Sequence, residues 1–123
     1  MFEISSNGII TISRGDSFTL NVFVNIGTVL DPLQYSLSGE DKLYFGLMEA
    51  NQPFECALIR KMYSEEDQDA ETGMVAMHFV PDDTEFLLPG KYYYMVKLVR
   101  VDAETGAETV DTIITKTRFI ILD

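Results

Sequence analysis

The amino-acid sequence predicts an all-β protein, an immunoglobulin-like antiparallel β-sandwich of about seven to eight strands. Short segments with apolar residues at alternate positions recur along the chain, as expected for strands with one buried face. The 8 Phe and 6 Tyr residues fit a pleated, half-buried surface. No segment repeats at a fixed spacing and no linker interrupts the pattern, so we expect a single domain over residues 1–123.

The first part of the chain predicts a short strand at residues 10–12 and a longer one at 18–24. In the longer strand alternate residues form one apolar face: Phe18, Leu20, Val22 and Val24. Arg14-Gly15-Asp16 lies between the two strands and also spells a cell-adhesion tripeptide. Because Gly and Asp are ordinary turn residues, we interpret this tripeptide as a turn or bulge.

The middle of the chain lacks periodicity over residues 27–41, which predicts a long loop with a short extended piece. Alternation returns at residues 43–48, and Asn51-Gln52-Pro53 forms a turn signal. We expect a return strand over residues 54–62, which would make residues 43–62 a hairpin. Cys56 lies in that strand and is predicted to be a small core residue.

The last part of the chain begins with an acidic segment, residues 64–73, that predicts an exposed loop. A strand at 74–80 follows, and Pro81 with acidic residues after it predicts one helical turn near 82–88. The clearest strand covers residues 91–101, and residues 102–106 form a hairpin loop. Residues 110–122 predict the return strand, with a bend near Lys116 because Ile113 and Ile114 are consecutive.

The charge of the chain limits the classes of partner that it can bind. The sequence has 20 Asp and Glu residues and 9 Lys and Arg residues, which give a net charge of −11. This balance argues against binding to nucleic acid or to anionic membrane surfaces. Cys56 is the only cysteine, so no intrachain disulfide is expected, which fits a reducing compartment. The N-terminus has no signal-peptide pattern, and the sequence has no apolar run of membrane-spanning length.

The residues that carry chemistry do not form a recognisable catalytic or metal set. His78 is the only histidine, and one His with one Cys cannot complete a zinc site. No Gly-x-Ser-x-Gly motif is present, and adjacent acids on a surface turn, such as Asp82-Asp83, do not face each other across a cleft. We therefore predict no enzyme activity, no cofactor, and no catalytic or metal-binding residue.

The acidic loop leaves one alternative open, because Asp67-x-Asp69-x-Glu71-x-Gly73 places carboxylates at alternate positions that can converge on calcium. An EF-hand loop needs Gly at its sixth position, and here Gly stands at the seventh. A solvated acidic loop is the favoured interpretation.

The tyrosine run Tyr92-Tyr93-Tyr94 places aromatic rings on both faces of one strand. Two of these rings fit the core, whereas Tyr93 points outward together with Met95 and Val99. Either the outward residues are covered by loops or by the other sheet, or they form an exposed patch for a partner. We predict Tyr93, Met95 and Val99 as the candidate interface residues.

Several segments together carry a resemblance to a known family. They are Ile12-Ser13-Arg14-Gly15-Asp16-Ser17-Phe18, Gly39-Glu40-Asp41-Lys42-Leu43-Tyr44-Phe45, Pro81-Asp82-Asp83-Thr84, Leu88-Pro89-Gly90-Lys91-Tyr92-Tyr93-Tyr94, Val110-Asp111-Thr112-Ile113-Ile114 and Phe119-Ile120-Ile121. Nearly the whole chain resembles a small domain of tailed phages and prophages of Gram-positive bacteria. That domain is similar to the N-terminal domain of the baseplate upper proteins of lactococcal-type phages.

The resemblance implies a non-enzymatic structural or assembly protein of a baseplate, tail or head fibre, located in the virion and acting through protein–protein contacts. It implies other phage structural proteins as partners, with a homo-oligomer as a further possibility. Baseplate upper proteins carry a long C-terminal part, so a chain of this length favours a free-standing assembly or accessory protein. The alternative is a ligand-binding sandwich that takes a carbohydrate or mediates calcium-dependent adhesion.

Overall fold

A computed structural model describes residues 2–28 and 30–123, so the predicted loop over 27–41 is described except at residue 29, and Met1 also lies outside the described residues. The strands are β1 (Phe2–Ile4), β2 (Ile10–Ser13), β3 (Phe18–Phe23), β4 (Lys42–Met48), β5 (Ile59–Tyr63), β6 (Met74–Phe79), β7 (Gly90–Val101) and β8 (Glu108–Leu122). The helical elements are η1 (Phe54–Cys56), η2 (Glu65–Asp67) and α1 (Pro81–Thr84).

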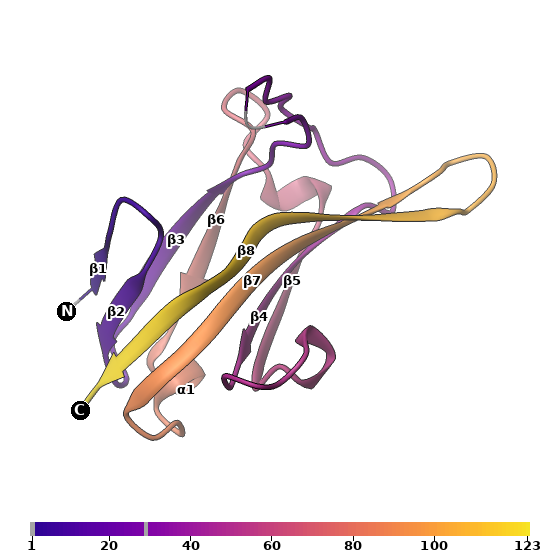
Figure 1. Ribbon diagram of the computed structural model, residues 1–123. Coiled ribbons are helices and arrows are strands. Elements are labelled where there is room, and N and C mark those ends of the chain that lie inside the picture. Colours follow the sequence, from indigo (N-terminus) through magenta and orange to yellow (C-terminus); the bar gives the residue numbers. More distant parts are fainter. Residues whose placement is uncertain (1, 29) are drawn as a thin grey trace.

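The strands form two layers, as Figure 1 shows. One sheet has six strands in the order β1-β2-β8-β7-β4-β5, and β3 pairs with β6 in a second sheet. This arrangement confirms the predicted all-β sandwich. The expected antiparallel pairing is wrong for one ladder, because β2 runs parallel to β8, with Ile10 opposite Phe119. Parallel neighbours need a long crossover connection, and here nearly the whole chain lies between the two strands.

The core lies between the sheets and is built by period-two alternation. In β3 and β7 every second residue is buried, as in Phe18, Leu20 and Val22. Aromatic rings fill the centre: Phe79 lies 4.4 Å from Phe18 and 4.9 Å from Phe45, measured between ring centroids. Burial of these apolar side chains is the main force that holds the layers together.

The segment after β4 differs from its prediction. Residues 54–62 do not form one strand, because η1 occupies Phe54–Cys56 and β5 begins only at Ile59. Cys56 is exposed, so its predicted place in the core is wrong. The ring of Phe54 packs over Gly46 of β4, and this contact turns the chain away from an extended path. Strand β1 was not predicted either.

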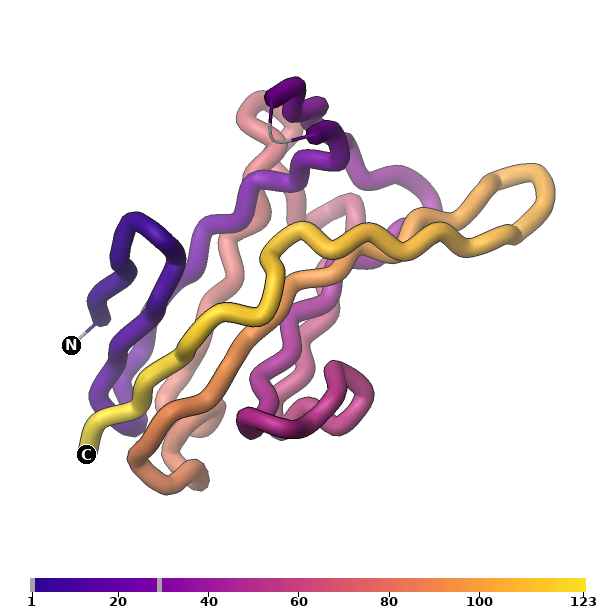
Figure 2. The backbone as a smooth tube through the Cα atoms, in the orientation of Figure 1, coloured from indigo at the N-terminus to yellow at the C-terminus, as the bar shows by residue number. Residues whose placement is uncertain are grey.

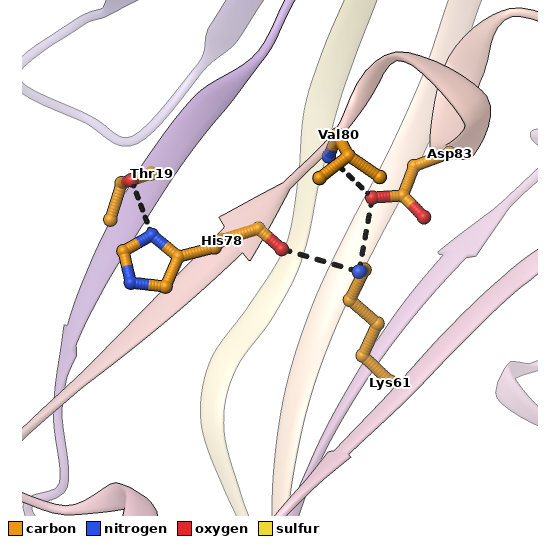
Figure 3. Close-up of polar contacts among 5 residues, drawn as sticks. All are labelled: Thr19, Lys61, His78, Val80 and Asp83. Carbon is orange, nitrogen blue, oxygen red and sulfur yellow. Dashed lines mark hydrogen bonds and ion pairs between the residues drawn. The ribbon is translucent and has the colours of Figure 1, made fainter.

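The predicted helical turn is present as α1, and an ion pair ties it to the opposite sheet (Figure 3). The Asp83 carboxylate accepts a hydrogen bond from the Val80 N–H at 2.8 Å and lies 3.0 Å from Lys61 Nζ. Lys61 Nζ also donates to the His78 carbonyl at 3.2 Å. Lys61 belongs to β5 and His78 to β6. The Lys61 side chain, which bonds to the His78 carbonyl and pairs with Asp83, therefore connects the edge strands of the two sheets.

The β7–β8 hairpin extends beyond the two layers as an arm (Figures 1 and 2). Pairing of β4 with β7 ends at Val99, so the hairpin from Arg100 to Thr109 has no β4 partner. Residues 102–110 are all exposed. Tyr94 pairs with Thr117 and Val96 pairs with Ile114, so the β7–β8 register shifts at residues 115–116. This irregularity confirms the predicted bend near Lys116.

Among the described residues, no helix is long and apolar enough to cross a membrane.

Candidate binding surface

The surface that holds the predicted interface residues is the face of the six-stranded sheet turned away from β3 and β6, which we call the outer face. Tyr92 and Tyr94 point into the core, so the neighbouring β7 residues point outward. Tyr93, Met95 and Val99 therefore share the outer face, and each is half-buried. The structure brings all three onto one surface, although they lie along one strand and not in a tight cluster.

A groove of about 400 Å³ opens on this face where β4, β7 and β8 meet the η1 segment. Val99 is the one predicted interface residue among those that line it, which are Tyr44, Phe54, Glu55, Arg60, Lys97, Val99 and Val110. We call it the outer groove. Its aromatic and aliphatic residues form an apolar surface, and its two cations, Arg60 and Lys97, outnumber its one acidic residue, Glu55.

Phe54 forms one wall of the outer groove because Gly46 leaves room for it. A Cβ atom on Gly46 would stand 2.7 Å from a carbon of the Phe54 ring. Lys97 Nζ lies 5.1 Å from the centre of that ring, and the Arg60 guanidinium carbon lies 5.9 Å from it. Arg60 also donates to the carbonyls of Phe54 and Glu55 at 3.2 and 3.0 Å. These contacts fix both cations beside the apolar surface.

The outer face collects most of the positive charge of an acidic chain. Six of the nine Lys and Arg residues lie on it: Lys42, Arg60, Lys91, Lys97, Lys116 and Arg118. In β4, β5, β7 and β8 the acidic residues are Glu108 and Asp111, and Asp111 pairs with Arg100 at 2.7 Å. Within residues 2–28 and 30–123, neither Arg60 nor Lys97 forms an ion pair. The outer face is therefore a basic surface on a molecule whose net charge is −11.

Tyr93 lies on the outer face but does not line the outer groove, and it is partly covered by one of these cations. Lys116 Nζ is 5.2 Å from the centre of the Tyr93 ring and donates to the Ala50 carbonyl at 2.7 Å. This geometry lies between the two predicted alternatives, since the ring is neither enclosed by a loop nor fully open.

A buried network holds the base of the arm against the loop that precedes β4. Asp41 is 1% exposed and accepts hydrogen bonds from the Tyr35 hydroxyl, from the Ser38 N–H at 3.1 Å and from the Val101 N–H at 2.8 Å. Burial alone would raise the pKa of Asp41, but these hydrogen bonds and the Arg100 charge lower it below its usual value. Burial and the bond to Asp41 raise the pKa of Tyr35 to about 12. Both groups therefore keep their hydrogen-bonding states at neutral pH.

The residues considered for chemistry are dispersed. His78 Nδ1 lies 2.8 Å from Thr19 Oγ1 on the exposed side of the small sheet (Figure 3). In the acidic loop the Asp67 carboxylate accepts from the Ser64 N–H at 2.8 Å, and the Asp69 carboxylate accepts from the Glu71 N–H at 2.8 Å. Across the part of the chain that the structure describes, no group of three or more His, Cys, Asp or Glu side chains could hold a metal ion.

Sequence reasoning did not identify Phe54, Arg60 or Val110 as members of a binding surface. The available signal was that Lys97 is an even number of residues from Tyr93 and Val99 in β7, which places all three on the same face of the strand. Comparisons of this protein with protein-family models, with curated proteins and with solved structures give no match.

Proposed function

We propose that this protein is a non-enzymatic structural or assembly protein of a phage or prophage, and that it works through protein–protein contacts made by its outer face. The observation that supports a contact function is the outer groove, where two cations without an ion-pair partner among the described residues flank exposed and half-buried apolar side chains. Exposed apolar surface that includes aromatic rings and Arg is typical of protein interfaces. The phage assignment is supported by the sequence resemblance.

The assignment is tested by mass spectrometry of purified phage particles induced from the strain that encodes this chain. We expect the chain in intact particles at a stoichiometric level. If intact particles lack the chain while the lysate contains it in abundance, a virion role is overturned.

The contact surface is tested separately by changing an outer-face residue and an exposed apolar residue elsewhere. Tyr93→Asp should abolish incorporation into particles, whereas Phe86→Asp, at a side chain 63% exposed outside the outer face, should not. Thermal unfolding of both purified variants shows whether each remains folded. Normal incorporation of a folded Tyr93→Asp variant would remove the patch around Tyr93 from the interface.

A further inference from the structure

We propose that the outer faces of two copies of this chain pack against each other about a two-fold axis that passes near Val99 and Val110. The inference rests on the proposed function in one respect, because it uses the same outer face as the contact surface. It goes further by naming the occupant, a second copy, and the residues that meet.

The centre of the contact is apolar. Val99 of β7 lies opposite Val110 of β8, and the two side chains share the outer face. Val110, the third residue of β8, is 59% exposed although its strand pairs with β7 at this point. Tyr44 and Val99 continue this surface into the outer groove.

Opposite charges flank that centre on its two sides. Glu108 lies opposite Val101, toward the tip of the arm, and Lys97 lies opposite Thr112, toward the body. Each is two residues from the valine pair along its strand, which corresponds to about 6–7 Å. From the arm toward the body, the outer face therefore presents acidic, apolar and basic groups in that order, with nearly equal spacing.

A two-fold axis through the apolar centre makes this order self-complementary. The rotation reverses the strand direction, so Glu108 of one copy comes over the end of the other copy that carries Lys97, and the reverse contact forms at the same time. Sheets that pack face to face lie about 10 Å apart, a separation that Lys and Glu side chains bridge together. Closed two-fold dimers with such isologous contacts are the commonest form of soluble oligomer.

The shape of the molecule permits this approach. The arm extends from the two layers (Figure 2), and residues 102–110 are exposed, so the arm of each copy can lie over the outer face of the other copy's body. Because each chain carries a net charge of −11, copies repel each other in most orientations. The arm carries Asp102, Glu104 and Glu108, and the two-fold rotation brings this acidic arm of one copy over the basic outer face of the other copy's body.

The test is a charge exchange followed by sedimentation velocity over a range of protein concentrations. We expect a reversible dimer for the unchanged chain. Lys97→Glu and Glu108→Lys should each raise the dimer dissociation constant by roughly tenfold, because each change affects both symmetry-related contacts. The double variant, with Lys97→Glu and Glu108→Lys, restores opposite charges across the axis and should recover most of the affinity.

Control variants separate this contact from a general effect of charge. Lys97→Glu takes the net charge from −11 to −13, as does Arg14→Glu just after β2, and Glu108→Lys takes it to −9, as does Glu85→Lys after α1. General repulsion predicts that Glu108→Lys strengthens association, whereas the proposed contact predicts that it weakens association. The two control variants should dimerise like the unchanged chain.

Three results would overturn the inference: a monomer at the highest attainable concentration, a dimer that Glu108→Lys strengthens, or single-variant losses that the double variant does not recover. Failure of the dimer and failure of the proposed function are distinguishable. A monomeric chain that is still present in particles removes the dimer and leaves the structural role. A dimer that is absent from particles removes that role and leaves the contact.

Discussion

The Tyr94 hydroxyl donates a hydrogen bond of 2.5 Å to the carbonyl of Gly8, across 86 residues of sequence. Tyr94 is 1% exposed and lies in β7, whereas Gly8 lies in the turn between β1 and β2. Burial raises the pKa of Tyr94, so the hydroxyl remains a donor over the physiological pH range. This bond connects the turn at the start of the sheet to its central strand.

We expect Tyr94→Phe to lower the free energy of unfolding by about 1–3 kcal/mol, because it leaves the Gly8 carbonyl without this donor. Amide hydrogen exchange should accelerate in β1 and β2 more than in β4 and β5. The control is Tyr44→Phe on the outer face, which should leave exchange in β1 and β2 unchanged. Equal acceleration in all strands would show that the bond has only a global effect.

Asp41→Asn should lower the free energy of unfolding by about 1–3 kcal/mol at neutral pH, because it weakens the hydrogen bonds that the buried Asp41 carboxylate accepts. The pKa of Asp41 is lowered in the folded state, whereas an unfolded Asp has a pKa of about 3.9. Its contribution is therefore present above that pH and is lost as the pH falls through the folded-state pKa. Urea unfolding at several pH values from 7 to 3 measures how this contribution to the free energy of unfolding depends on pH.

The difference between Asp41→Asn and the unchanged chain should accordingly shrink in acid. Asp82→Asn, at an exposed position of α1, is the matched control and should behave like the unchanged chain. A difference that stays constant from neutral to acidic pH would contradict the stabilising role of the Asp41 charge.

Phe79→Ala should lower the free energy of unfolding by about 3–5 kcal/mol, because it opens a cavity among the stacked rings of the core. Phe86→Ala removes the same number of atoms from a side chain that is 63% exposed, and it should change stability by less than about 0.5 kcal/mol. Chemical denaturation of both variants measures the contrast. Similar decreases in the free energy of unfolding for the two variants would contradict the exposed position of Phe86 in this structure.

Gly46→Ala should leave the fold intact and displace Phe54 from the outer groove, because the new Cβ would stand 2.7 Å from its ring. Gly46 does not have a positive φ, so the backbone itself tolerates Ala. NMR should show loss of the ring-current shift on the Lys97 side chain. Combining Gly46→Ala with Phe54→Ala should remove the clash and restore stability lost by Gly46→Ala alone.

The strands of the core could be predicted because their pattern is local. Alternation in β7 and β3 shows in the sequence which residues point inward, and it also places Tyr93, Met95 and Val99 on one face. Strand β1 could not be predicted in this way, because three residues are too few to show a period.

The remaining features depend on contacts between distant segments. Cys56 belongs to an apolar stretch, yet it is exposed because the chain bends where Phe54 packs on Gly46. The basic outer face arises from the pairing order β5-β4-β7-β8, which joins cations from four strands. The local alternation pattern of the sequence does not reveal that order, so the charge of this surface could not be predicted from the composition.

The parallel pairing of β2 with β8 also affects how the protein is made. Ile10 pairs with Phe119, so this ladder forms only after residue 119 has been synthesised and has left the ribosome. Until then, the β2 edge that pairs with β8 and the core-facing side chains of Ile10 and Ile12 lack part of their final cover. Contacts of such long sequence separation slow folding and lengthen the period in which an intermediate can aggregate.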